Sequence, residues 1–303
     1  MNTPVAFIVF NRLEVARRVF ARIREARPSR LFVIADGPRP DRPDDLAKVA
    51  AVRALIDGGV DWPCDVVRDY SAHNIGCRDR IHSGLGNVFA RTEEAIILED
   101  DCLPDPSFFE FCARLLRDHR DTPEVMNIGG TNLAAPQFQN MPESHWFTRH
   151  VWIWGWASWR RAWALDDHHM TTWEQRLPTV RRTFASAWER QYWLSTWEAA
   201  RRDLVTTNAW DFPWMYSVRS LNGLAILPAD NLVENLGFGI DSTHTGPEAA
   251  RLHLPATPSR PHRAPARMTV DRYRDEMITR AYADAGFDLR TNLRSRWRTT
   301  FRP

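Results

Sequence analysis

The strongest constraint on the fold is the alternation of short apolar runs with amphipathic segments through the first 130 residues. Each apolar run is rich in β-forming residues, and between the runs apolar side chains recur at helical spacing. The expected strands are 5–10, 31–35, 65–68, 95–98 and 125–128, and the expected helices are 13–26, 45–56, 80–91 and 108–118. Strands that alternate with helices form parallel, right-handed βαβ units. The pattern therefore predicts an α/β fold with a mostly parallel sheet flanked by helices.

The pattern changes after residue 145. Residues 146–163 are aromatic and irregular, 172–202 and 210–221 are mostly helical, 224–227 is a strand candidate and 231–245 is an expected loop. Prolines then gather in 247–266, and a helix is expected at 270–285 before an arginine-rich tail. We therefore expect a principal domain over residues 1–245 and a C-terminal extension over 246–303, made of a Pro-rich linker, a helix and a basic tail.

Composition excludes several classes of protein. The 303 residues, 44% of them hydrophobic, suffice to bury a core, and the net charge of +2 does not predict a nucleic-acid partner. The apolar run 4–10 is too short to cross a bilayer and lacks the flanks of a secretion signal, so a cytoplasmic location is expected. The cysteines form no CxxC pair, which favours reduced thiols in a cytosolic protein and argues against a zinc site.

Three consecutive acids, Glu99, Asp100 and Asp101, follow the apolar run Ala95–Leu98. In open α/β sheets ligands bind beyond the carboxyl ends of the strands, where Asn11 and Arg12 and then Asp36 and Gly37 are also expected. Extended backbone would point Glu99 and Asp101 one way and Asp100 the other. Adjacent carboxylates repel each other, and a bound Mn²⁺ or Mg²⁺ that also neutralises a diphosphate would relieve that repulsion.

The alternative for these acids is that they stabilise the N-terminus of the next helix. Asp105-Pro106 already supplies a capping side chain and a proline suited to the first turn. Asp101 is therefore not needed for that purpose, which favours the metal site.

Three segments together resemble a known family. They are Val5–Arg12 (VAFIVFNR), Ile97–Asp101 (ILEDD) and Asp105–Phe111 (DPSFFEF). They resemble the GT-A nucleotide-sugar glycosyltransferases, and are most similar to the N-acetylglucosaminyltransferase I type and its bacterial relatives. The resemblance covers roughly residues 4–245 and implies a Rossmann-like GT-A fold, in which the strand-end Glu-Asp-Asp is a variant of the DXD motif.

The resemblance implies roles for individual residues. Asp101 would hold the cation, Asp100 would contact the ribose or donor sugar, and Asp36 would contact the uracil base. Asn11 and Arg12 would lie near the nucleotide, with Gly37 in the loop beside Asp36. Arg78 and Arg80 are either nucleotide or diphosphate contacts or surface charges. Gly155 and Trp156 resemble the family's Gly-Trp turn beside the donor sugar.

Asp211 lies in Trp210–Trp214, which resembles the WDDW segment whose first acid is the catalytic base. Its apolar neighbours are expected to raise the pKa of the carboxyl group by desolvation, and a base would take the proton of the acceptor hydroxyl. The alternative is that Asp211 caps a helix that begins at Phe212-Pro213. His244 is a second metal-ligand or diphosphate candidate, against the alternative of a solvated loop histidine. His168 and His169 are expected at the surface.

Twelve of the 14 tryptophans lie between Trp146 and Trp214. Most are expected in the core, where large aromatic side chains dominate packing energetics. Trp154 and Trp156 are the candidates for stacking on a sugar.

The sequence therefore predicts an inverting, divalent-metal-dependent glycosyltransferase that moves a hexosyl or N-acetylhexosaminyl group from a nucleotide-diphosphate donor, by default UDP, to a glycan or glycolipid acceptor. The arginine-rich tail suggests peripheral contact with the inner membrane. The alternatives are a sugar nucleotidyltransferase and a non-catalytic sugar-nucleotide-binding protein. A nucleotidyltransferase would carry a glycine-rich loop after the first strand, and residues 11–14 contain no glycine.

Overall fold

The structure is a computed structural model that describes residues 1–203, 209–238 and 254–284. The strands of the main sheet are β1 (Val5–Val9), β2 (Arg30–Ala35), β3 (Asp65–Tyr70), β4 (Glu94–Glu99), β6 (Val125–Gly129), β7 (His145–Thr148), β8 (Trp156–Trp159) and β9 (Leu224–Pro228). Two short strands, β5 (Cys102–Pro104) and β10 (Val233–Asn235), pair separately. The helices are α1 (Leu13–Ala26), α2 (Asp45–Gly59), α3 (Cys77–Arg91), α4 (Ser107–Asp118), α5 (Arg160–Trp163), α6 (Trp173–Arg182), α7 (Ala187–Arg202), α9 (Asp211–Ser220) and α10 (Arg272–Asp284), with 3-10 turns η1 (Ala135–Phe138) and η2 (Leu236–Phe238).

The main sheet has eight strands in the order β3-β2-β1-β4-β8-β6-β9-β7. Neighbouring strands are parallel from β3 through β4 and between β6 and β9, and β8 and β7 run antiparallel to their neighbours. The predicted α/β class and mostly parallel sheet are confirmed.

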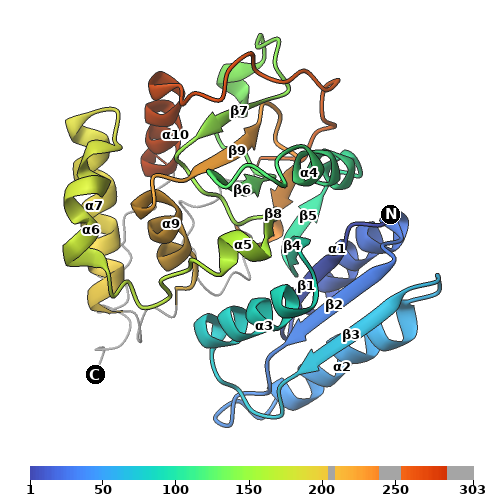
Figure 1. The fold of residues 1–303 in the computed structure, drawn as a ribbon. Coiled ribbons are helices and arrows are strands. Elements are labelled where there is room, and N and C mark those ends of the chain that lie inside the picture. The colour runs from blue at the N-terminus through green and yellow to red at the C-terminus, as the bar shows by residue number, and fades with distance from the viewer. Residues whose placement is uncertain (204–208, 239–253, 285–303) are drawn as a thin grey trace.

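Helices cover both faces of this sheet (Figure 1). Apolar residues of α1, α2 and α4 pack on one face, and those of α3, α5, α6, α7, α9 and α10 pack on the other. β1 is buried along its whole length, as expected for a strand covered on both faces. In α1 the stripe Ala16, Val19, Phe20 and Ile23 is buried, which is the spacing that predicts this helix.

The aromatic segment 146–163 is not irregular. It contributes the strands β7 and β8 and the short helix α5. β8 lies in the middle of the sheet, where Ala157 pairs with both Ile96 of β4 and Ile128 of β6. All four residues of β8 are buried, so its sequence carries no alternation of apolar and polar residues that would have predicted a strand.

The expected loop 231–245 is wrong over 233–238. These residues form β10 and η2, and Asn235 of β10 pairs with Cys102 of β5. A three-residue strand is too short to produce a periodic pattern, and its partner lies far away in sequence. This pairing brings η2 against the turn that carries Asp101, since the Leu236 amide donates to the Asp101 carbonyl at 2.8 Å.

The described part of the proline-rich segment and α10 pack against the rest of the chain. Arg260 pairs with Asp230 at 2.6 Å, and the Arg263 carbonyl accepts from the Ser144 amide. The α10 residue Asp275 accepts from the Arg149 amide at 3.1 Å. The expected boundary at residue 245 and the basic tail after residue 284 lie outside the described residues.

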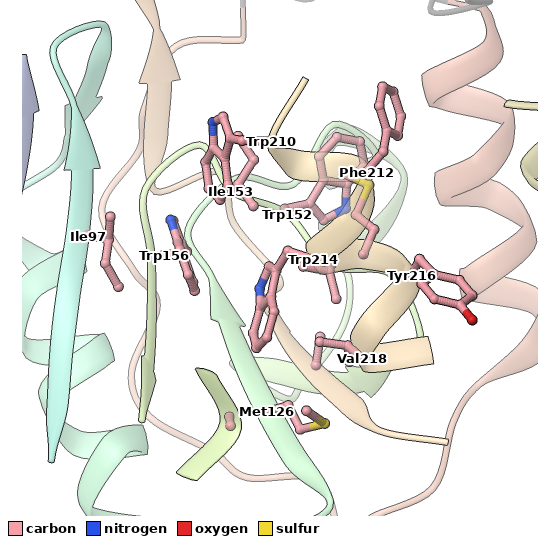
Figure 2. Close-up of a cluster of buried hydrophobic side chains, with 14 of the residues drawn as sticks. Ile97, Met126, Trp152, Ile153, Trp156, Trp210, Phe212, Trp214, Tyr216 and Val218 are labelled. Atoms are coloured by element: carbon pink, nitrogen blue, oxygen red, sulfur yellow. The ribbon is translucent and has the colours of Figure 1, made fainter. Parts of the chain in front are cut away.

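Most of the tryptophan-rich region is core, as predicted. Trp156, Trp210 and Trp214 converge between β4, β8 and α9 (Figure 2), and the ring centroids of Trp156 lie 5.8 Å from Trp214 and 6.0 Å from Trp210. Trp188 is the exception among the twelve, with 42% of its surface exposed, and Trp154 is partly buried.

No helix within the described ranges is both long and apolar enough to cross a membrane.

Candidate functional site

The acid cluster lies at the carboxyl end of β4, beside the end of β1. β4 ends at Glu99, and Asp100 and Asp101 form a turn before β5 begins at Cys102. The Arg12 guanidinium contacts both acids, with Nη2 at 3.0 Å from Asp101 Oδ2 and in a short ion pair with Asp100. The expectation that Asp100 and Asp101 point in opposite directions is therefore wrong, because the backbone turns after Glu99 instead of remaining extended.

Burial dominates the electrostatics of this cluster. Desolvation and the neighbouring charges of Asp101 and Asp100 hold the pKa of Glu99 well above its ordinary value. Desolvation also raises the pKa of Asp100, although Arg12 acts in the opposite direction. Burial alone would lower the pKa of Arg12, but its two carboxylate partners outweigh burial and raise it. Arg12 therefore does not compensate all three acids, and the ionised form of Glu99 is disfavoured.

Asp211 belongs to the same electrostatic neighbourhood, although it lies 110 positions after Asp101 in the sequence. Its charge contributes to the raised pKa of Glu99. Desolvation raises the pKa of Asp211 to about 6, against partial opposition from the amides of Asp211 and Phe212. The expected rise in pKa is thus confirmed. α9 begins at Asp211 itself and the amides of Asp211 and Phe212 act on this carboxyl group, so the alternative that Asp211 stabilises the helix start also stands.

Two residues that the sequence did not single out also line this cluster. Cys77 at the start of α3 is exposed by surface area, and desolvation together with the charges of Glu99, Asp211, Asp100 and Asp101 raises the pKa of its thiol. Gly237 lies so close to the cluster that a Cβ there would be 2.5 Å from Asp101 Oδ2. Neither residue belongs to a periodic or local motif, and both reach the cluster through tertiary packing.

The loops after β1 and β2 are braced by the side chains predicted to contact the nucleotide. Asn11 Nδ2 donates to the buried Asp45 at 2.8 Å. Asp36 accepts three backbone bonds, from the amides of Gly37, Ile75 and Gly76 at 2.8, 3.1 and 3.0 Å. Gly37 permits the loop to approach, since a Cβ there would lie 2.4 Å from the backbone of His73. Contact of these residues with a nucleotide remains a prediction.

Arg78 and Arg80 are both largely buried at the start of α3, so the surface-charge alternative is wrong. Arg80 pairs with Asp69 of β3 at 2.6 Å, which ties α3 to the edge of the sheet. Arg78 Nε donates to Asp79 at 3.0 Å. A contact of either arginine with diphosphate remains a prediction.

Gly155 adopts a left-handed backbone conformation with φ of 66°, and a Cβ there would meet Val233 of β10 at 2.6 Å. A hydrogen bond from its amide acts to lower the pKa of the buried Cys102 thiol, which directly follows the acid cluster in sequence. Glycine is therefore required for this turn to approach the cluster. Trp156, in contrast, has no exposed surface, so the expectation that it stacks on a sugar is wrong and the ring belongs to the core. Trp154 keeps partial exposure beside it.

Carboxylate oxygens are the ligands that Mg²⁺ and Mn²⁺ prefer, so the chemistry of these acids suits a hard divalent cation, while Arg12 pairs with Asp100 and Asp101 in this structure. Asp101 is the more exposed of the Arg12 partners, at 17% of its side chain against 5% for Asp100. Asp105 accepts from the Ser107 amide at 2.9 Å and so caps α4, as expected. Asp101 is thus free of that task. His244 lies outside the described residues.

His168 is not at the surface, as had been expected, but is largely buried, whereas His169 is exposed. Two surface hollows, of about 640 and 920 Å³, lie elsewhere, the first near Arg149 and α10 and the second against α1 and α2. Neither hollow contains a residue of the acid cluster. The candidate site is therefore identified by its ionisable side chains and not by the shape of the surface.

No protein-family profile matches the chain, and no curated protein matches it in sequence. Solved structures that match in three dimensions include galactosyltransferase LgtC with donor and acceptor sugar analogues, at 15% identity and a TM-score of 0.34 over 57% of this chain and 64% of that one. Mouse xyloside xylosyltransferase 1 in its apo form matches at 13% identity and 0.35, over 58% and 75%. UDP-glucose pyrophosphorylase in complex with UDP-glucose matches at 9% identity and a TM-score of 0.27. This match covers 50% of this chain and 64% of that one. The chain thus spans less than two thirds of the galactosyltransferase. Similarity at this level does not establish a family, and the functional argument rests on the residues of the chain itself.

Proposed function

We propose that the chain is an inverting, divalent-metal-dependent glycosyltransferase that uses a nucleotide-diphosphate sugar, with UDP as the expected nucleotide. The observation that carries the proposal is that Asp211 lies near enough to the carboxyl end of β4 for its charge to contribute to the raised pKa of Glu99. A half-buried carboxylate with a pKa of about 6 near a group of acids suits a general base next to a metal site.

In the donor half, Asp101 would hold Mn²⁺ or Mg²⁺, and Asp100 would contact the donor. A cation bound there would neutralise the charge of the departing diphosphate. Arg12 contacts both carboxylates and so fixes their orientation. The N-terminus of α3, which begins at Cys77 beside the cluster, adds the positive end of a helix dipole that favours phosphate.

In the acceptor half, Asp211 would accept the proton of the attacking hydroxyl group. A base with a pKa of about 6 is mostly ionised at neutral pH yet is more basic than an exposed aspartate. The acceptor would be a glycan or glycolipid. Membrane contact through the arginine-rich tail remains part of the proposal, and the nucleotidyltransferase alternative is disfavoured by the absence of glycine in residues 11–14.

The test is nucleotide release from a panel of UDP-hexoses and UDP-N-acetylhexosamines, with Mn²⁺, Mg²⁺ or a chelator. We expect metal-dependent release from at least one donor. Asp211→Asn should slow release about 10²–10⁴-fold, the range for loss of a general base, and leave UDP binding in the presence of Mn²⁺ unchanged. Asp101→Asn should weaken metal-dependent UDP binding.

Asp105→Asn is the matched control, because it neutralises a carboxylate four residues from Asp101 in a residue that caps α4, and asparagine also caps helices. It should retain both binding and release. Release that ignores the chelator would exclude metal dependence, and full activity of Asp211→Asn would exclude Asp211 as the base.

A further inference from the structure

Two histidines and an aspartate converge beneath α3, in a place that the proposed transfer reaction does not use. His82 lies on α3, and Asp166 and His168 lie in the segment between α5 and α6. Each residue offers one atom that could bind a metal, and these three atoms all lie within 4.8 Å of one another. The imidazole rings of His82 and His168 are stacked, with centroids 3.9 Å apart and planes 17° from parallel, so one ring must turn before both can direct a ring nitrogen at a shared ion.

One contact in this group has the spacing of metal ligands but not the geometry of a hydrogen bond. His82 Nδ1 lies 3.2 Å from Asp166 Oδ2. The same nitrogen is buried and has no hydrogen-bond partner among the described residues. Metal–nitrogen and metal–oxygen bonds of roughly 2.0–2.2 Å separate neighbouring ligand atoms by roughly 3.0–3.5 Å. The two atoms are therefore already at the distance that a shared ion requires.

The surrounding side chains hold the candidate ligands in place. Ser217 Oγ of α9 donates to Asp166 Oδ1 at 3.1 Å, which leaves Oδ2 directed at His82. Asp79, one turn before His82 on α3, lies 3.5 Å from His168 Nε2. A carboxylate against the second nitrogen of a ligating histidine is the arrangement that orients imidazole ligands at metal sites.

We propose that His82, Asp166 and His168 form a site for a transition-metal cation, for which Zn²⁺ is the representative ion. Imidazole favours Zn²⁺ and similar transition metals over Mg²⁺ or Ca²⁺, so the site differs in chemistry from the all-carboxylate cluster at β4. A bound ion would link α3 to the segment that leads into α6 and to α9 through Ser217. The site is independent of the proposed transfer reaction, since neither Asp101 nor Asp211 is among its three candidate ligands.

The test uses the full chain, stripped of metal with a chelator and titrated with Zn²⁺ in the absence of nucleotide. We expect one Zn²⁺ to bind, and His82→Gln and His168→Ala each to weaken that binding more than about 100-fold, since loss of even an outer-shell partner costs roughly 10–100-fold. His169→Ala is the matched control, because His169 is the exposed neighbour of His168. It should bind Zn²⁺ as the unaltered protein does.

His82 keeps 38% of its side chain exposed, so His82→Gln gives a folded variant even if His168→Ala does not fold. Ring-nitrogen NMR shifts on Zn²⁺ addition should appear for His82 and be absent from His169. Failure of the unaltered chain to bind Zn²⁺, or binding that persists unchanged in His82→Gln, would overturn the site. Both results are separate from nucleotide release, which reports on Asp101 and Asp211.

Discussion

Two regions of the molecule bury carboxylates in opposite ways. On the helical side, Glu189 of α7 is fully buried and its Oε1 lies 3.1 Å from His150 Nε2 and 3.3 Å from Arg219 Nη2. Burial alone would raise the pKa of Glu189, but His150 and Arg219 outweigh it and lower the pKa to about 2. Glu99 at the end of β4 and Asp211 at the start of α9 have raised pKa values and no ion-pair partner within the described residues.

This difference distinguishes a buried carboxylate that stabilises the fold from one that a ligand or a reaction requires. Glu189 has partners that make its ionised form favourable in the folded state, so the network joins α7 to α9 without a ligand. Ionisation of the acid cluster lowers the stability of the folded state. Natural proteins retain such destabilising groups where a bound ligand offsets the charge or where catalysis requires it. The same residue type therefore gives opposite predictions in the two regions.

The largest expected effect is the loss of Glu189. Glu189→Ala leaves Arg219 buried without its carboxylate, and breaking one side of a buried ion pair costs about 3–5 kcal/mol of unfolding free energy. Urea denaturation measures the change. Glu198→Ala on the same helix removes an exposed partner of Arg202 and should change stability by less than about 0.5 kcal/mol. Equal effects of the two substitutions would contradict the structural role of Glu189.

A smaller effect of opposite sign is expected at Asp211. Asp211→Asn removes a carboxylate whose ionisation is disfavoured in the folded state, and should stabilise the metal-free protein at pH 7.5 by roughly 1–3 kcal/mol. The same variant should lose nucleotide release, as set out above. A destabilised Asp211→Asn variant would show that the carboxylate serves the fold and would remove the contrast with Glu189.

An effect on the same scale is the pH dependence of stability without metal. The pKa of Asp211 rises on folding from 3.8 to about 6, so its contribution to stability is present below pH 3.8 and is lost as pH rises through 6. The pKa of Glu189 falls to about 2, so its contribution is present above pH 4.5 and is lost as pH falls toward 2. Between pH 4.5 and 6.5 we expect stability to fall by up to about 1.4 kcal/mol per pH unit for each group with a raised pKa.

Melting temperatures across that range measure this decline. Asp211→Asn should make the decline shallower and Glu198→Ala should leave it unchanged. A melting temperature that rises from pH 4.5 to 6.5 would contradict excess buried negative charge at the end of β4.

Much of the first half of the fold follows from local pattern. The apolar runs and helical stripes of β1 to α4 specify which side chains are buried, and ends that differ by a few residues, such as Cys77 for α3 and Gly59 for α2, reflect tertiary contacts at the helix ends. The strand-end position of Glu99–Asp101 was predictable for the same reason. β8 was not, because a strand buried on both faces by aromatic residues has no periodic signal.

The sequence by itself determined the alternating α/β core and the position of the acids at a strand end. Only the tertiary structure decided what surrounds them: that Arg12 reaches Asp100 and Asp101 together, that Asp211 joins the cluster from far along the chain, that Trp156 is core and that His82 meets His168. The physical reason is range. Hydrophobic periodicity and capping act over a few residues, whereas desolvation and charge depend on neighbours that packing alone brings together.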